Sequence, residues 1–146
     1  MSAVVPARST APGPRYKARA ARDHFKDVLD AAEAGAAPCV MRSTPLVLLD
    51  ALVLEELLAE KAPFEVLSSV TADQVAFWLE DGTVHAVGHH LDEATEAFLD
   101  ALVEYAEDWL TDLRDAPNHA HNRWLVLRVA LHAGDRTALE AAVFGH

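Results

Sequence analysis

The sequence predicts an α+β protein that contains two small domains, and three observations lead to this prediction. Apolar residues recur at steps of three and four over residues 21–35, which end in a glycine, and this pattern indicates an amphipathic helix. A longer apolar stripe over residues 91–113 predicts a long helix. Between residues 64 and 88, alternating segments flank Asp81 and Gly82, a dipeptide typical of β-hairpins.

Residues 1–61 divide into an arm and a compact segment. Residues 1–14 are rich in Pro, Ala and Ser, so we expect a flexible N-terminal arm, and the domain itself should span residues 15–61. Residues 15–20 fit either a short strand or an arm. Two short strands should lie around a turn at residues 43–45, and Asp50 is placed to cap a helix over residues 51–60.

Residues 62–146 form the second expected domain, which starts again with strands. The segments 64–70, 74–80 and 83–88 predict an antiparallel meander in front of the long helix. Residues 115–122 break that helix. Residues 123–135 are long enough for a helix and β-branched enough for a strand; we favour a helix, because residues 133–135 resemble a stop followed by a new cap. A short final helix should follow.

Charge is distributed unevenly along the chain, whose formal net charge is −11. Residues 1–61 hold eight basic and eight acidic residues, whereas residues 62–146 hold four basic and fifteen acidic ones. The first 22 residues hold five basic residues and no acidic one. A basic N-terminal segment followed by an acidic remainder indicates two partners of opposite charge. The alternative is a disordered tail beside a solvated acidic surface.

Several classes of protein are disfavoured. No apolar run reaches membrane-spanning length and the N-terminus lacks the apolar block of a signal peptide, so we expect a cytoplasmic protein without a membrane partner. The single cysteine, Cys39, excludes an intrachain disulfide and is expected to be a small buried residue. The three tryptophans, Trp78, Trp109 and Trp124, are expected as core or interface anchors.

The polar residues do not form a recognisable catalytic or metal-binding pattern. His119 and His121 resemble a ligand pair, and His89 and His90 are adjacent, but a zinc site needs three or four convergent ligands. The sequence has no cysteine pair, no His-Glu-x-x-His motif and no phosphate-binding glycine loop. We therefore expect no catalytic residue, no metal and no cofactor.

Residues 15–60 carry a first resemblance. The stretches "ARDHFKDVLDAAEAG" and "CVMRSTPLVLLDALVLEELL" resemble the N-terminal domain of Phd/YefM-type antitoxins, with matches at Ala21, Arg22, residues 33–35, Arg42 and residues 45–50. The turn "RSTP" is shorter than the usual basic, glycine-containing turn. The resemblance implies a symmetric homodimer that binds operator DNA. Arg22 and Arg42 occupy family positions, and Arg15, Lys17 and Arg19 are added as DNA-binding candidates because of their charge.

The second domain carries another resemblance. Three strands around the Asp-Gly turn and the stretch "GHHLDEATEAFLDAL" are similar to the HicB-like antitoxin domain, with matches at Gly88 and residues 91–94. His90 stands where a threonine commonly caps the helix, which leaves the capping box half built. The fused arrangement resembles Phd-like antitoxins paired with RelE-type toxins.

The resemblances imply an antitoxin of a type II toxin–antitoxin system, which is not an enzyme. It would neutralise a cognate toxin, of RelE type, and repress its own operon as a DNA-bound dimer. The acidic second domain would bind the basic toxin through its helix face and through apolar residues outside the core. The candidates are Glu93, Asp100, Glu104, Asp108, Trp124 and Phe144. The alternative is an acidic protein-binding module without a DNA-binding function.

Overall fold

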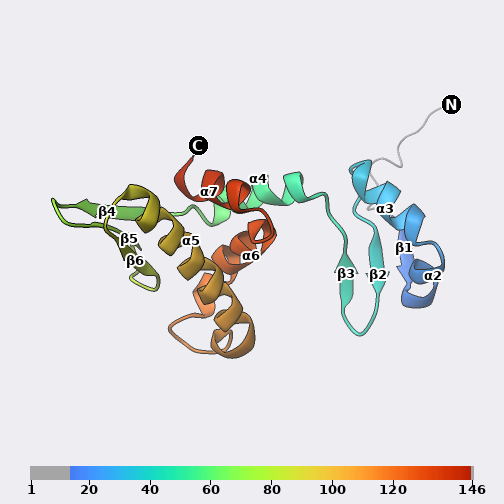
Figure 1. Ribbon diagram of the computed structural model, residues 1–146. Coiled ribbons are helices and arrows are strands. Elements are labelled where there is room, and N and C mark those ends of the chain that lie inside the picture. Colours follow the sequence, from blue (N-terminus) through green and yellow to red (C-terminus); the bar gives the residue numbers. More distant parts are fainter. Residues whose placement is uncertain (1–13, 146) are drawn as a thin grey trace. The chain divides into compact units, whose positions relative to one another are not determined.

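The computed structural model describes residues 14–145, and their contacts divide the chain into two compact units after Leu54 (Figure 1). Each unit combines helices with a three-stranded sheet, so the predicted α+β class is confirmed. The arm expected over residues 1–14 falls outside the described residues except for its last position. Helix α4 (Ala51–Lys61) spans the division, and the domain boundary expected near residue 62 lies at its C-terminal end.

The first unit is a small sheet with two helices beside it. Strand β1 (Arg15–Lys17) pairs in parallel with β2 (Cys39–Met41), and β2 pairs antiparallel with β3 (Pro45–Val47). Helices α2 (Ala18–Asp23) and α3 (Phe25–Glu33) lie between β1 and β2 in the sequence. The interior consists mainly of small side chains, contributed by Ala21, Val28, Ala32, Pro38 and Cys39. Cys39 is buried and free, as expected.

The single helix expected over residues 21–35 is instead two helices. His24 separates them with φ −119° and ψ 37°, outside the helical region. The apolar periodicity runs through the break because Ala21 and Val28 are both buried, and periodicity alone does not detect a one-residue change in backbone direction. The C-terminal stop was correctly placed, since Gly35 follows α3 with φ 92°.

The second unit begins with the later part of α4 and continues with a meander. The cap of α4 is the one expected, because Asp50 Oδ1 accepts the Leu52 N–H at 2.7 Å. Strands β4 (Val66–Val70), β5 (Val75–Leu79) and β6 (His85–Gly88) form an antiparallel sheet in the order β4-β5-β6, as predicted.

The turn between β5 and β6 is longer than the expected two-residue hairpin. Strand pairing stops at Leu79, whose N–H donates to the Val84 carbonyl at 2.9 Å, and β6 starts only at His85. Asp81 stabilises this wider turn, because its Oδ1 accepts bonds from the Thr83 N–H at 3.0 Å and hydroxyl at 2.7 Å. The Asp81 carboxylate therefore stabilises this turn through hydrogen bonds to a residue two positions further along the chain.

Helical segments complete the described part of the second unit. Helix α5 (Leu91–Asp108) continues as a π-helical turn, η1 (Trp109–Leu113), so the helical region ends where it was expected but changes its hydrogen bonding after Asp108. A 3₁₀ turn, η2 (Ala120–Asn122), precedes α6 (Arg123–His132), which confirms the helical interpretation of this stretch. The last helix is α7 (Arg136–Phe144).

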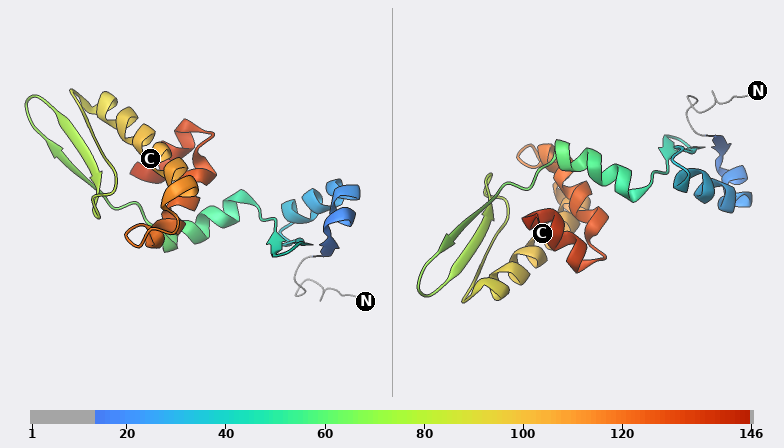
Figure 2. Two further views of the ribbon diagram at one scale, coloured as in Figure 1. Left: turned by 90° about the horizontal axis from the view of Figure 1, so that it is seen from below. Right: turned by 90° about the horizontal axis from the view of Figure 1, so that it is seen from above.

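The main core lies in the second unit, between the sheet and these helices. Phe98, Leu99 and Leu102 of α5 are fully buried and pack with side chains from β5, α6 and α7. Helices α5, α6 and α7 lie to one side of the sheet (Figure 2). Trp109 belongs to this core, whereas Trp124 is 40% exposed. Among the described residues, no helix has the length and hydropathy needed to cross a bilayer.

Candidate functional site

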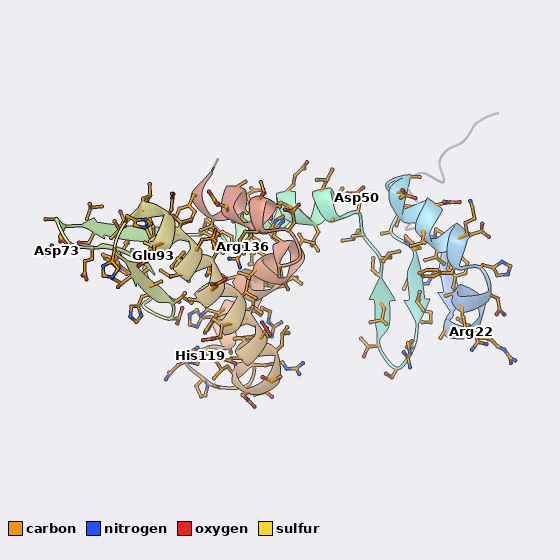
Figure 3. The ribbon with its side chains drawn as sticks, in the orientation of Figure 1. Arg22, Asp50, Asp73, Glu93, His119 and Arg136 are labelled. Atoms are coloured by element: carbon orange, nitrogen blue, oxygen red, sulfur yellow. The ribbon has the colours of Figure 1, made fainter. Side chains whose placement is uncertain are left out.

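We call five basic residues of the first unit, Arg15, Lys17, Arg19, Arg22 and Arg42, the basic cluster. All five are exposed. The parallel pairing of β1 with β2 places Lys17 opposite Met41, so that Arg42 follows directly beside it. Arg19 and Arg22 are three residues apart on α2 and therefore share a face. Figure 3 shows Arg22 extending away from the body of this unit.

The basic cluster is only weakly neutralised. Arg22 Nε lies 3.9 Å from Asp23, and both side chains are largely exposed, so solvent screens this pair. Arg15 Nη2 contacts Met41 Sδ at 3.4 Å, which involves no charge on the partner. Lys26, by contrast, pairs with Asp30 at 2.7 Å along α3. The unpaired positive charge of this unit is therefore concentrated on β1, α2 and the turn after β2.

Next to the basic cluster, the first unit has an open apolar hollow of about 560 Å³. Phe25 and Val28 of α3 line it together with Leu46 and Val47 of β3, and Arg22 and Arg42 of the basic cluster line it as well. Phe25, Leu46 and Val47 remain 58%, 50% and 55% exposed. Clustered apolar side chains of this kind mark an interaction surface more often than isolated ones do.

The second unit contains an ion-pair cluster formed by Glu55, Arg128 and His132. Arg128 Nε lies 3.0 Å from Glu55 Oε1 and Nη2 lies 2.9 Å from Oε2, while His132 Nε2 lies 2.7 Å from Oε1. Arg128 Nη1 also donates to the Ala62 carbonyl at 3.0 Å, and the guanidinium lies 4.6 Å from the centre of the Phe64 ring. No pattern in the sequence points to this cluster, because Glu55 and Arg128 are 73 residues apart.

The cluster is structural rather than catalytic in character. Arg128 is only 6% exposed, and each of its donor groups has an acceptor. Burial by itself raises the pKa of Glu55, but the hydrogen bonds and charges of Arg128 and His132 outweigh it, so the pKa lies below its ordinary value of 4.5. The cluster therefore ties α4 to α6 through a carboxylate that stays ionised.

The histidines considered as metal ligands serve other contacts. His119 Nδ1 lies 2.9 Å from the Tyr105 hydroxyl, which also accepts a bond from Asn122 Nδ2 at 2.9 Å. His121 Nε2 lies 3.7 Å from Asp81. Within residues 14–145, no group of three His, Cys, Asp or Glu side chains is arranged to hold a metal ion.

The N-terminus of α5 explains the Gly-x-x-Leu-Asp-Glu-Ala motif. His90 Nδ1 accepts the Glu93 N–H at 3.4 Å, and Glu93 Oε1 accepts the His89 N–H at 2.8 Å, so the capping box is complete rather than half built. A Cβ at Gly88 would clash with the Ala94 backbone nitrogen and would lie 2.8 Å from the Ala94 Cα. The motif thus reflects a close approach of β6 to α5.

The residues expected to bind a toxin have different environments. Glu104 and Asp108 are exposed on α5, Asp100 pairs with Arg136 at 2.5 Å, and Glu93 is engaged in the cap. Figure 3 labels Glu93 and Arg136. Trp124 is exposed, as expected. Phe144 was expected outside the core, and this is wrong: its ring lies 5.1 Å from that of Phe77 and it packs against the core. The apolar pattern of residues 136–144 does not show which face of α7 packs against the core.

Comparison with known proteins identifies the family to which this chain belongs. A family model described as PHD_like, antitoxin of toxin–antitoxin, RelE/RelB, TA system, matches residues 14–143. The match covers most of the chain, which therefore belongs to this antitoxin family. Membership points to a regulatory protein rather than an enzyme and implies a cognate toxin as partner. The prediction of an antitoxin of a RelE/RelB-type system is therefore confirmed as far as the family is concerned.

A solved structure has a similar fold. It is the crystal structure of an antitoxin part of a proposed toxin/antitoxin system from Syntrophomonas wolfei subsp. wolfei, with a TM-score of 0.66 and 18% sequence identity. The alignment covers 88% of this chain and 94% of that one. At this identity the likeness shows the fold alone. Among curated proteins, none matches this sequence significantly.

Proposed function

We propose that this antitoxin neutralises a RelE-type toxin through its second unit and represses its own operon by binding operator DNA as a homodimer through its first unit. The first unit would then be a Phd/YefM-like domain and the second a HicB-like domain. The observation that carries the proposal is the division of surface chemistry between the two units. The first has a basic cluster beside an open apolar hollow, and the second has most of the chain's carboxylates.

Dimerisation follows from the apolar hollow of the first unit. A unit of this size buries few large side chains, and Phe25, Leu46 and Val47 around the hollow remain exposed. Covering them with the same face of a second copy removes apolar area from water, at about 1.5–3 kcal/mol for each large side chain that becomes fully buried. A two-fold axis through this contact would place two basic clusters on one assembly, which suits a palindromic operator.

DNA binding follows from the basic cluster. Its arginines and lysine are exposed, poorly neutralised and located on neighbouring elements. Each phosphate that they neutralise releases counterions, so the cluster supports salt-dependent binding to duplex DNA. Arg22 and Arg42 also line the hollow, so a dimer formed there would hold basic residues of both copies near the same interface.

Toxin binding follows from the acidic second unit. Residues 62–146 hold fifteen acidic and four basic residues, and Glu104 and Asp108 project from α5 into solvent. An acidic surface steers a basic protein into contact and makes association sensitive to salt. The second unit has its own core, so little chain would need to be ordered on binding, which favours affinity.

Two measurements on the full chain test the proposal. Growth rescue by co-expression with the toxin encoded by the neighbouring gene tests neutralisation, and fluorescence anisotropy with DNA from the chain's own promoter tests repression. We expect rescue, and we expect promoter binding that weakens as salt increases. Failure to rescue growth contradicts toxin neutralisation. Rescue without promoter binding contradicts the repressor function and leaves an acidic protein-binding module.

A further inference from the structure

The sheet of the second unit has one uncovered face. Val75, Phe77 and Leu79 of β5 are buried under the helices, so the alternating residues Ala76 and Trp78 face the other way. The register places Leu67 of β4 opposite Trp78 and Val87 of β6 opposite Ala76, and it also places the polar residues Ser69 and His85 on this face. We call these four residues, Leu67, Ala76, Trp78 and Val87, the outer sheet face.

The outer sheet face is mainly apolar and is accessible, and the polar side chains of Ser69 and His85 lie beside it. Leu67 and Val87 are 44% and 47% exposed, and Trp78 is half-buried. The helices α5, α6 and α7 all lie on the opposite side of the sheet (Figure 2). Strand β4 forms one edge of this sheet; its sequence, VLSSV, has no charge and no proline, and Val70 is 73% exposed. Edge strands without such protection are ready surfaces for another chain.

Two carboxylates lie at one end of the outer sheet face. Glu80 donates its N–H to the Glu65 carbonyl at 3.1 Å, which continues the β4–β5 ladder and brings the two side chains together. The hydrogen bond that a protonated Glu65 can donate to the Glu80 carboxylate, and the repulsion between the two charges, raise the pKa of Glu65, and no basic group contributes to that shift. Like charges directly opposite each other across two strands destabilise the sheet.

Within the described residues, the nearby lysine does not neutralise this pair. Lys61, Glu65 and Glu80 line the same hollow of about 340 Å³, but the Lys61 ammonium is placed over the Trp124 ring, 5.9 Å from its centre. The two glutamates therefore present uncompensated negative charge next to an apolar surface. A cation supplied from outside would relieve their repulsion.

We propose that the outer sheet face, together with Glu65 and Glu80, is a binding surface for the cognate toxin. An apolar segment of the toxin covers Leu67, Trp78 and Val87, and a lysine or arginine of the toxin sits between the two glutamates. The inference rests on the proposed function and names where the toxin binds. Charge favours a basic toxin over a second copy of this chain, because a second copy docked face to face would bring another pair of carboxylates.

The variant Glu80→Lys separates binding from folding. The introduced ammonium can pair with Glu65, so we expect the midpoint of thermal unfolding of the free full-length chain to rise. The same change removes the site for the toxin's cation, so we expect the affinity for the purified toxin of the neighbouring gene to fall at least tenfold in calorimetry. A variant that merely damages the fold would lower both quantities.

Asp115→Lys is the matched control, because Asp115 is exposed, lies after η1 and outside the acidic face of α5, and the change in net charge is the same. We expect it to weaken toxin binding much less than Glu80→Lys does. Equal losses from both variants would show that only long-range charge matters, and unchanged affinity of Glu80→Lys would also overturn the inference. Failure of the unaltered chain to bind the toxin would instead contradict the proposed function.

Discussion

Arg128 and Glu55 form a bidentate ion pair, in which Arg128 Nε lies 3.0 Å from Glu55 Oε1 and Arg128 Nη2 lies 2.9 Å from Glu55 Oε2. Glu55 lies in the middle of α4, so this pair attaches the C-terminal half of the connecting helix to the second unit. Leu58, on the same part of α4, is only 3% exposed. A fragment that starts at residue 62 would therefore leave the Arg128 guanidinium buried without its carboxylate.

Replacing Glu55 should strongly destabilise the second unit. Glu55→Ala leaves a buried, unpaired guanidinium, and breaking a buried ion pair in this way costs about 3–5 kcal/mol. Urea unfolding followed by circular dichroism measures the change. Glu56→Ala is the control, because Glu56 is the exposed neighbour on the same helix, and its unfolding midpoint should barely move. Similar midpoints for the two variants would contradict the structural role of Glu55.

The same pair should make stability depend on pH in the acid range. The pKa of Glu55 is lowered in the folded chain, so its contribution is fully present above the ordinary value of 4.5 and is lost as the pH falls through the folded pKa. We expect Glu55→Gln to show a smaller loss of unfolding free energy than the unaltered chain between neutral pH and acid. Parallel stability curves for the two proteins would rule this contribution out.

Gly88 should tolerate no side chain. A Cβ there would clash with the Ala94 backbone nitrogen and lie 2.8 Å from the Ala94 Cα, so Gly88→Ala forces β6 away from α5. Overpacking of this kind costs about 1–3 kcal/mol. Gly134→Ala is the matched control, because nothing lies within 4 Å of its added Cβ. Thermal unfolding should separate the two variants clearly, and equal midpoints would mean that β6 and α5 are not in close contact.

The basic cluster should govern DNA binding. We expect the triple variant Lys17→Ala, Arg19→Ala, Arg22→Ala to lose promoter binding while remaining folded, since the three side chains are exposed. The slope of log affinity against log salt should become shallower by about 0.9 for each DNA phosphate that the variant no longer neutralises. Lys26→Ala also removes an exposed lysine, but one that is paired with Asp30, and should bind almost normally. Wild-type affinity of the triple variant at moderate salt would refute this assignment.

The hollow of the first unit should hold the dimer together. Leu46→Asp places a charge where we expect the second copy to pack, so the mass measured by light scattering at micromolar concentration should fall from dimer to monomer. Leu110→Asp is the control, because Leu110 is equally exposed, at 50%, but lies in the second unit. A monomeric mass for the unaltered chain would count decisively against dimerisation.

Some of the proposed binding surfaces can be recognised in the sequence, and others only in the three-dimensional structure. The sequence alone pointed to the basic cluster and to the acidic α5 face, because charge is visible residue by residue. Phe144 could not be placed that way: it packs against Phe77, and only the three-dimensional structure shows that α7 turns it inward. The outer sheet face was equally hidden, since alternation in β5 does not say which of its faces the helices cover.

The sequence by itself determined the local elements and their ends. Alternating and helical apolar patterns located the meander, α5 and α6, and Asp50 caps α4 as its position predicts, because these features depend on neighbouring residues. The tertiary structure alone decided the Glu55–Arg128 pair, the break at His24 and the close approach of Gly88 to Ala94. The ion pair joins residues that are distant in the chain, the break depends on one backbone angle, and the approach of Gly88 to Ala94 depends on how β6 packs against α5. None of the three leaves a periodic signal in the sequence.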